Sequence, residues 1–241
     1  VVHLANHTSG LPGIIRDLYP EEKNKLRELS FAGQADYLSH YNADSLLKDL
    51  HNVVPDTIPG TRYRYNTNGV MLLQYILERV YHRNYAKLTT EYLKTRLNLQ
   101  EITPILNRKQ MKLTAQGYTK DRKPQSYVNL EGYYIGPSMN GTMRDLLGYV
   151  KAQLDEREPA IRFSHQLTWT GANGFAIGLN WMYNTENGIH YFYHDGNTKL
   201  GFNSLCTIYP AQQLGIFIIA NDVHSPEKIR HMENIIFDAV K

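Results

Sequence analysis

The sequence has almost no cysteine and no long apolar run. Its single cysteine, Cys206, excludes an internal disulfide and a cysteine-rich metal site. No apolar stretch approaches the roughly 20 residues that a membrane-spanning helix needs, and no signal peptide opens the chain. We therefore expect no membrane span in this chain. The cysteine content leaves the compartment open, since a secreted protein need not contain disulfides.

Positive and negative charges are nearly balanced in the sequence. The 26 basic and 23 acidic residues give a formal net charge of +3, and they are interspersed along the chain. A nucleic-acid-binding domain concentrates its basic residues on one face, so no nucleic-acid partner is expected. His3 and His7 have the spacing of a metal-binding pair on a helix, but no Glu follows His3 as in the His-Glu-x-x-His motif. We predict no metal and no cofactor.

Apolar residues are sufficient for a substantial core. With 42% hydrophobic residues among 241, and no repeat, linker or low-complexity tract, the chain is expected to form one domain over residues 1–241. Helical spacing prevails over residues 14–158. Residues 159–241 change to short apolar and aromatic runs bounded by Gly, Asn, Asp or Pro, which predict an antiparallel sheet. The expected strands are 175–183, 189–194, 202–209 and 214–221.

A last helix is expected after the sheet, with Ser225 as its cap and Pro226 at its first position. Its inward face is predicted to carry Ile229, Met232, Ile235, Ile236 and Ala239. An earlier helix is expected to begin with the cap Thr142 and to point Leu146, Leu147 and Val150 inward. The predicted fold class is α/β of the α+β type: an antiparallel sheet flanked by helices, beside a mostly helical part.

Turn residues run directly into an apolar helix at Pro59–Gly69 and Val70–Tyr81. Pro59-Gly60 predicts a turn, and Thr67 or Asn68 is predicted to cap the helix. The inward face of that helix is expected to repeat at Val70, Leu73, Leu77 and Val80. Tyr65 then lies at a loop-to-helix junction, where a phenol can transfer protons if a cation lowers its pKa. The alternative is a packing tyrosine, one of 18 in the chain.

Three stretches occur in an order that matches a known family. Leu4–Pro12 contains His-Thr-Ser-Gly-Leu-Pro, Pro59–Leu73 contains Pro-Gly-Thr and Tyr65, and His194-Asp195-Gly196 precedes Gly201–Ser204. Together they resemble the serine β-lactamase and penicillin-binding-protein family, in the branch of class C β-lactamases, D-Ala-D-Ala carboxypeptidases and related esterases. Weaker echoes occur at Gly117-Tyr118, and at Gly141-Thr142 with Asp145-Leu146.

The resemblance implies a β-lactamase/transpeptidase-like fold and acyl transfer through a serine. In that family a Ser-x-x-Lys supplies the nucleophile and precedes His-Thr-Ser-Gly by some tens of residues, so we expect the nucleophile in an N-terminal segment outside this chain. Two Ser-x-x-Lys strings do occur, Ser45–Lys48 and Ser225–Lys228. We predict that neither holds the nucleophile, because the first falls between the matched motifs and the second begins with a helix cap.

The resemblance assigns roles to individual site residues. It implies that Tyr65 carries the proton and that the Asn197 backbone N–H donates to the oxyanion, with Thr67, His194 and Gly196 as substrate-binding residues. The family usually has Asn at the position of Thr67, and a one-residue shift would recruit Asn66 instead. Without the resemblance, His194 is more simply a solvated histidine at a strand end. The segment 197–200 is a residue longer than usual.

The predicted function is a serine hydrolase acting on a small-molecule or peptide substrate: a D-Ala-D-Ala peptide, a β-lactam or an ester. The alternative is a non-catalytic family member that binds peptide or acts as an assembly module. The resemblance implies a periplasmic or extracellular location, and the oligomeric state stays open.

Overall fold

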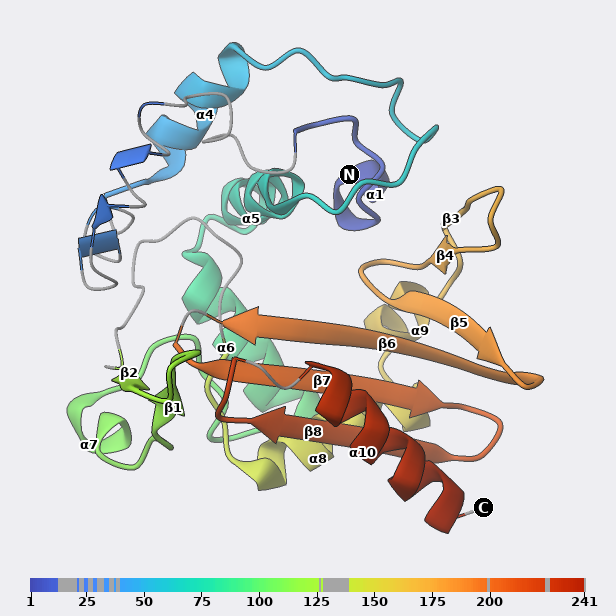
Figure 1. Cartoon of the computed structure of the whole chain (residues 1–241). Coiled ribbons are helices and arrows are strands. Elements are labelled where there is room, and N and C mark those ends of the chain that lie inside the picture. Colours follow the sequence, from blue (N-terminus) through green and yellow to red (C-terminus); the bar gives the residue numbers. More distant parts are fainter. Residues whose placement is uncertain are drawn as a thin grey trace.

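The computed structural model describes residues 1–12, 21, 24–25, 28–29, 33–34, 37, 40–125, 127, 139–198, 200–223 and 226–240. Its centre is a six-stranded antiparallel sheet in which each strand pairs with the next along the chain (Figure 1). The predicted antiparallel meander is therefore confirmed. The strands are β3 (Trp169–Thr170), β4 (Ala176–Ile177), β5 (Met182–Glu186), β6 (Ile189–Thr198), β7 (Phe202–Tyr209) and β8 (Leu214–Ala220).

Successive side chains on a strand point to opposite faces of the sheet. Both faces are buried, each by a different helix. On β7, Leu205 packs with Ile229 of the last helix, whereas Ile208 packs with Val150 of an earlier one. The sheet thus lies between two helices, as the expected fold class requires (Figure 1). These helices are α8 (Met143–Asp155) and α10 (Pro226–Ala239).

The remaining described elements precede the sheet along the chain. Helix α1 contacts α5, and α5 in turn contacts α4 and α6. In the part of the chain that the structure describes, no helix is long and apolar enough to span a bilayer. The elements are α1 (Val2–Ala5), α4 (Ala43–His51), α5 (Thr67–Tyr81), α6 (Tyr85–Leu97), α7 (Arg108–Met111), α9 (Pro159–Ser164), β1 (Gly117–Tyr118) and β2 (Pro124–Gln125).

Helix α5 begins earlier than predicted, because its N-cap precedes both of the residues expected to cap it. Asn66 is the N-cap, and its side-chain oxygen accepts the N–H of Gly69 at 2.5 Å. Thr67 and Asn68 already lie inside the helix, so predicting either as the cap was wrong. The inward face also differs: Met71 is buried against α4, whereas Val80 is 64% exposed.

The buried face of α10 is also different from the predicted one. Glu233 and Phe237 are buried with Ile229, while Met232 and Ile235 are about half exposed. The reason is a polar contact that periodicity cannot show: the Glu233 carboxylate accepts a hydrogen bond from the Tyr209 hydroxyl at 3.0 Å. A paired carboxylate can occupy an interior position that an unpaired one cannot. The predicted cap Ser225 lies outside the described residues.

Other boundaries shift by a few residues. Thr142 caps α8 as predicted, accepting the N–H of Asp145, but Leu147 is exposed where an inward position was expected. The single strand expected at 175–183 is two strands, β4 and β5, separated by a tight turn that Gly178 and Trp181 close. Strand β6 continues to Thr198, four residues beyond its expected end.

Candidate active site

Tyr65 is held at the junction of a loop and α5 by contacts with the segment after α1. The backbone N–H of Asn66 donates to His7 Nδ1 at 3.3 Å, and the N–H of Arg64 donates to the His7 carbonyl at 2.9 Å. The His7 and Tyr65 rings lie 4.4 Å apart between centroids. Tyr65 is 55% exposed as a whole residue. The backbone on both sides of Tyr65 is therefore fixed, while its side chain is partly buried and partly open to solvent.

His7 supports this junction as a neutral, buried ring. It is 2% exposed, and its backbone adopts a left-handed conformation with φ of 58° just after α1 ends. Burial lowers its pKa from 6.5 to about 4. His3 and His7 do not share one helical face, because α1 ends at Ala5 and His7 lies beyond it. Among the described residues, no three His, Cys, Asp or Glu side chains are grouped to hold a metal.

The depressed pKa of His7 predicts acid sensitivity. The folded state favours neutral His7 more than the unfolded state does. This preference contributes fully to the stability of the fold above pH 6.5, and the contribution is lost as the pH falls toward 4. It amounts to about 3 kcal/mol in the free energy of unfolding. We expect His7→Asn, which tolerates the left-handed backbone, to reduce the stability lost between pH 7 and pH 4.5 in urea unfolding. His165 and His194 also have lowered pKa values, so some loss should remain. An unchanged pH dependence would contradict this role of His7.

Strand β6 presents an open backbone edge near its end. Strand β5 pairs with β6 only as far as Tyr193, and in the described part of the chain no other strand covers that edge beyond it. The carbonyl of Thr198 points toward the turn to β7, where it accepts the N–H of Gly201 at 3.1 Å. Neighbouring residues on a strand direct their backbone groups to opposite edges. The N–H of Asn197 therefore points to the open edge.

The end of β6 lies close enough to Tyr65 for their charges to interact. Burial, followed by the Asp195 carboxylate, raises the pKa of Tyr65. Burial also lowers the pKa of His194, and His194 disfavours the charged form of His7. Asp195 of β6, which lies between the predicted site residues His194 and Gly196, is therefore within electrostatic range of Tyr65. Neither influence on Tyr65 favours the phenolate.

His194 differs from the simpler alternative of a solvated histidine at a strand end. It lies within β6, opposite Cys206 of β7, and burial keeps it neutral. At neutral pH it can offer a hydrogen bond but no charge.

Glycine at position 196 has a packing reason within the sheet. Gly196 pairs with Ser204, and a Cβ atom at position 196 would lie 3.0 Å from Ser204 Oγ. The predicted role of Gly196 in substrate binding stays a prediction.

Asn66 and Thr67 have separate tasks. The Asn66 amide donates to Ser9 Oγ at 3.0 Å and to the Leu11 carbonyl at 3.2 Å, while its oxygen caps α5. Asn66 is 1% exposed, so its amide is used within the protein. Thr67 is half-buried at the first helical position, next to Tyr65. Since the Asn66 amide is used within the protein, substrate contact by Thr67 stays a prediction.

Ser45 lies at the start of α4, within a helix cap. Its N–H and its hydroxyl donate to Asn42 Oδ1 at 3.1 and 3.3 Å. Helix α4 packs on α5 through Leu46 and Met71, and lies on the opposite side of α5 from the sheet (Figure 1). The second string, Ser225–Lys228, begins outside the described residues.

The sequence motifs missed three aromatic residues near Tyr65: Tyr63, Trp169 and Phe175. Trp169 Nε1 donates to the carbonyl of Gly60 at 2.9 Å, and the Tyr63 and Phe175 rings lie 4.5 Å apart. The available signal was the pair of aromatics on either side of a Gly-rich turn at 171–174. It does not reveal the partner loop, which is more than 100 residues away.

Glycine at position 117, part of a weaker match to the family, also has a structural reason. A Cβ atom there would lie 2.0 Å from the Leu200 carbonyl, so only glycine fits where β1 approaches the turn after β6. That turn is part of the longer segment 197–200, of which Lys199 lies outside the described residues.

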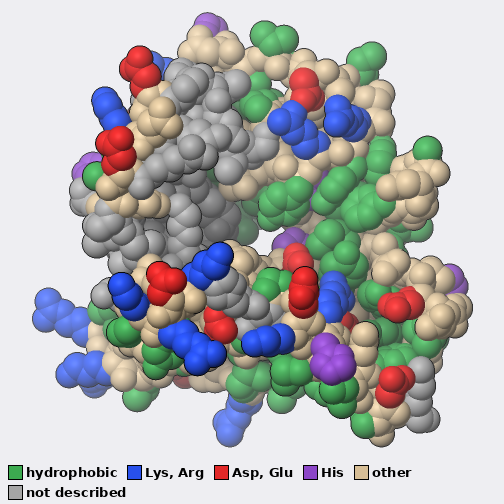
Figure 2. All heavy atoms as spheres, in the orientation of Figure 1, with side chains coloured by type: hydrophobic (Ala, Val, Ile, Leu, Met, Phe, Trp, Pro, Cys, Tyr) green, Lys and Arg blue, Asp and Glu red, His purple; other side chains and the backbone are tan. Residues whose placement is uncertain are grey.

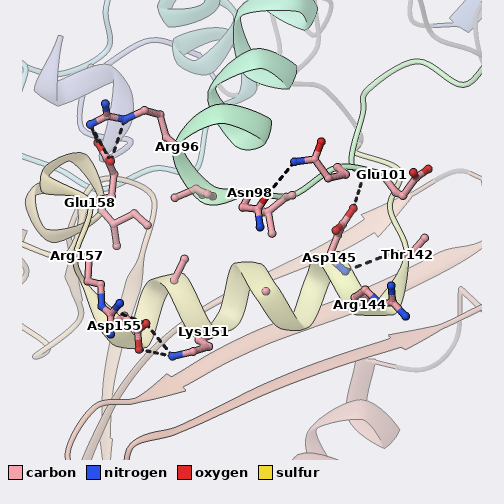
Figure 3. A pocket seen from close by; sticks show the side chains of 16 residues that line it. Arg96, Asn98, Glu101, Thr142, Arg144, Asp145, Lys151, Asp155, Arg157 and Glu158 are labelled. Atoms are coloured by element: carbon pink, nitrogen blue, oxygen red, sulfur yellow. Dashed lines mark hydrogen bonds and ion pairs between the residues drawn. The ribbon is translucent and has the colours of Figure 1, made fainter.

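A pocket of about 980 Å³ lies elsewhere, between the end of α6, α8 and α9 (Figure 3). Its charges largely pair with one another: Arg96 with Glu158, and Lys151 with Asp155. None of the predicted site residues lines it. The candidate site is therefore the region around Tyr65 and β6.

Comparisons with known proteins agree with the sequence motifs. The family model described as beta-lactamase matches residues 1–241. The chain is 27% identical over 252 residues to the protein flp of Staphylococcus aureus strain MRSA252, covering 98% of this chain and 46% of that protein. The chain thus spans about half the length of the curated relatives that it matches.

Solved structures show the same fold. A beta-lactamase/D-alanine carboxypeptidase from Yersinia pestis, complexed with citrate, aligns with a TM-score of 0.71 at 19% identity, over 92% of this chain and 63% of that one. A D-stereospecific amidohydrolase from a Streptomyces species aligns with a TM-score of 0.71 at 19% identity, over 92% of this chain and 67% of that one. With the family model matching the whole sequence, the chain belongs to the beta-lactamase family, a family of serine hydrolase type.

Proposed function

We propose that this chain carries the proton-transfer and oxyanion-binding half of a serine hydrolase site. The nucleophilic serine and its lysine are then supplied by sequence outside these 241 residues, and the substrate is a peptide, a β-lactam or an ester. The observation that supports the proposal is that the Asp195 carboxylate of β6 influences the pKa of Tyr65, on the strand whose open edge leaves the N–H of Asn197 without a strand partner in the described structure. Acyl transfer needs both of these groups.

In the proposed reaction, the serine hydroxyl attacks the substrate carbonyl. The carbonyl oxygen becomes an oxyanion, which accepts a hydrogen bond from the Asn197 N–H. The serine proton passes through the Tyr65 phenol to the leaving nitrogen or oxygen, whose bond to the carbonyl carbon breaks. Water then attacks the acyl ester by the reverse path, which releases the acid and restores the serine.

Tyr65 needs help to accept the proton, because burial and Asp195 raise its pKa. A cation beside the phenol would lower that pKa, and the lysine of the proposed Ser-x-x-Lys supplies one. The described chain therefore holds the proton carrier without the charge that activates it.

The other site residues orient the substrate. Thr67 offers a hydroxyl at the start of α5, in place of the amide that is usual in the family. Neutral His194 hydrogen-bonds a substrate carboxylate, and Gly196 leaves the strand backbone accessible. The location that suits such substrates is periplasmic or extracellular, and cell fractionation would test it: recovery only in the cytosol would contradict this placement.

The test compares residues 1–241 with a longer protein that retains the sequence before Val1. Both are assayed with a chromogenic cephalosporin and a chromogenic ester, and both are examined for an acyl adduct by intact-mass spectrometry. We expect turnover and an adduct only in the longer protein, because the shorter chain lacks an activated nucleophile.

Matched variants decide between the remaining possibilities. Ser45→Ala and Ser225→Ala should leave the activity of the longer protein unchanged. Turnover by residues 1–241 that Ser45→Ala abolishes would identify Ser45 as the nucleophile and contradict the proposal. A folded longer protein that forms no adduct would instead indicate a non-catalytic, peptide-binding member of the family.

A further inference from the structure

Three aromatic side chains form a continuous cluster, called here the aromatic shelf: Tyr63, Trp169 and Phe175. Ring centroids are 4.5 Å apart for Tyr63 and Phe175, 6.1 Å for Tyr63 and Trp169, and 6.4 Å for Trp169 and Phe175. Each side chain is half-buried. The shelf therefore keeps part of its aromatic surface open while its rings support one another.

The shelf is continuous with the candidate active site. Tyr63 precedes Tyr65 by two residues, and the His7 ring lies 6.0 Å from the Tyr63 ring and 4.4 Å from the Tyr65 ring. Figure 2 shows hydrophobic side chains gathered beside a hollow near the centre of this face. A group bound on the shelf would lie next to the Tyr65 phenol.

Two polar contacts fix the β3–β4 hairpin, which carries two of the three shelf residues, Trp169 and Phe175. Trp169 Nε1 donates to the Gly60 carbonyl at 2.9 Å, and Asn6 Nδ2 donates to Thr168 Oγ1 at 3.1 Å. The shelf thus joins the loop of Tyr65 to the hairpin with a defined geometry. A rigid surface loses less entropy on binding than a mobile one.

The shelf is uncharged. Burial, with a smaller contribution from Tyr65, raises the pKa of Tyr63 to about 12, so its phenol remains neutral at physiological pH. Flat, neutral aromatic surface favours an aromatic partner through stacked or edge-to-face contacts, with a gain beyond the area buried.

We propose that the aromatic shelf binds an aryl group of the substrate, adjacent to the carbonyl that is attacked beside Tyr65. The link to catalysis rests on the proposed function, whereas binding of the aryl group does not. The shelf thus favours substrates that carry an aryl group over those with only a methyl group there.

A matched pair of ligands tests the proposal without requiring turnover. N-phenylacetylglycine and N-acetylglycine share a carboxylate and an amide and differ by one phenyl group. The chain has two tryptophans, and the other, Trp181, is only 6% exposed, so tryptophan fluorescence reports on the shelf. We expect the phenyl ligand to bind the folded chain at least about tenfold more tightly, the worth of one good aromatic contact.

Single substitutions test which tryptophan gives the fluorescence change and which residue gives the preference for the phenyl ligand. Trp169→Phe should remove the fluorescence change and Trp181→Phe should keep it. Phe175→Ala, and the milder Phe175→Leu if the first variant unfolds by circular dichroism, should bring the phenyl ligand within about threefold of the acetyl ligand. Phe163→Ala, at an aromatic residue 55% exposed outside the shelf, should change neither affinity.

Three outcomes would overturn the shelf as an aryl site: equal affinities in the unaltered chain, binding of neither ligand, or a phenyl preference that survives in a folded Phe175 variant. Absence of hydrolysis has a different meaning. A chain that keeps its phenyl preference but comes from a longer protein without turnover would count against the proposed function alone.

Discussion

Tyr65→Phe should lower the turnover of the enzyme containing this chain by about 10²–10⁴-fold, the usual worth of a positioned proton-transfer group. The substitution removes only the hydroxyl. The ring keeps its contact with His7, and the backbone contacts of Asn66 and Arg64 with His7 do not involve the phenol oxygen. The measurement is steady-state kinetics on a chromogenic ester, beside the unfolding midpoint.

Tyr81→Phe is the matched control, since Tyr81 lies at the far end of α5 with a similar exposure, 56% against 55% for Tyr65. It should leave turnover unchanged. A loss below about threefold for Tyr65→Phe, with the protein folded, would return Tyr65 to the class of packing tyrosines.

The second large effect concerns a single backbone N–H. Asn197→Pro should reduce kcat by about 10²–10³-fold, the effect of removing one oxyanion donor. Proline lacks the N–H, and its ring is tolerated on a strand where that group points away from the neighbouring strand. Since Asn197 directs its N–H to the open edge of β6, the pairing with β7 should survive.

Asn197→Ala is the control, because it keeps the backbone N–H and removes the exposed side chain. Its activity should stay within a few-fold of the original. Equal losses in Asn197→Ala and Asn197→Pro would show that the side chain, and not the N–H, is required. An unfolded Asn197→Pro protein would show that the N–H pairs within the sheet, which contradicts the orientation derived for β6.

Elements with local signals were predictable from the sequence. Strands β7 and β8 have the expected boundaries within one residue, because each is an apolar run between turn residues. The position of Tyr65 just before α5 followed from a turn signal beside an apolar helix. Asn66 was missed as the cap because several residues there are good caps, and the choice depends on its contacts with Ser9 and Gly69.

Features that depend on distant contacts were not predictable. Glu233 is buried because Tyr209, 24 residues away, and Arg230 on the same helix both pair with its carboxylate, so apolar periodicity predicted the wrong face of α10. The open edge of β6 depends on where β5 stops pairing, which composition does not encode. The aromatic shelf likewise depends on the contact between Trp169 and Gly60, 109 residues apart.

We propose that the proton carrier and an oxyanion donor lie in this chain while the nucleophile lies outside it. Peptide mapping of the acyl adduct in the longer protein tests this most directly. The protein is labelled with a β-lactam or an activated ester, digested, and sequenced by tandem mass spectrometry. We expect an acylated serine three residues before a lysine, in a peptide outside residues 1–241. An adduct on Ser45, Ser225 or any other serine within residues 1–241 would contradict it.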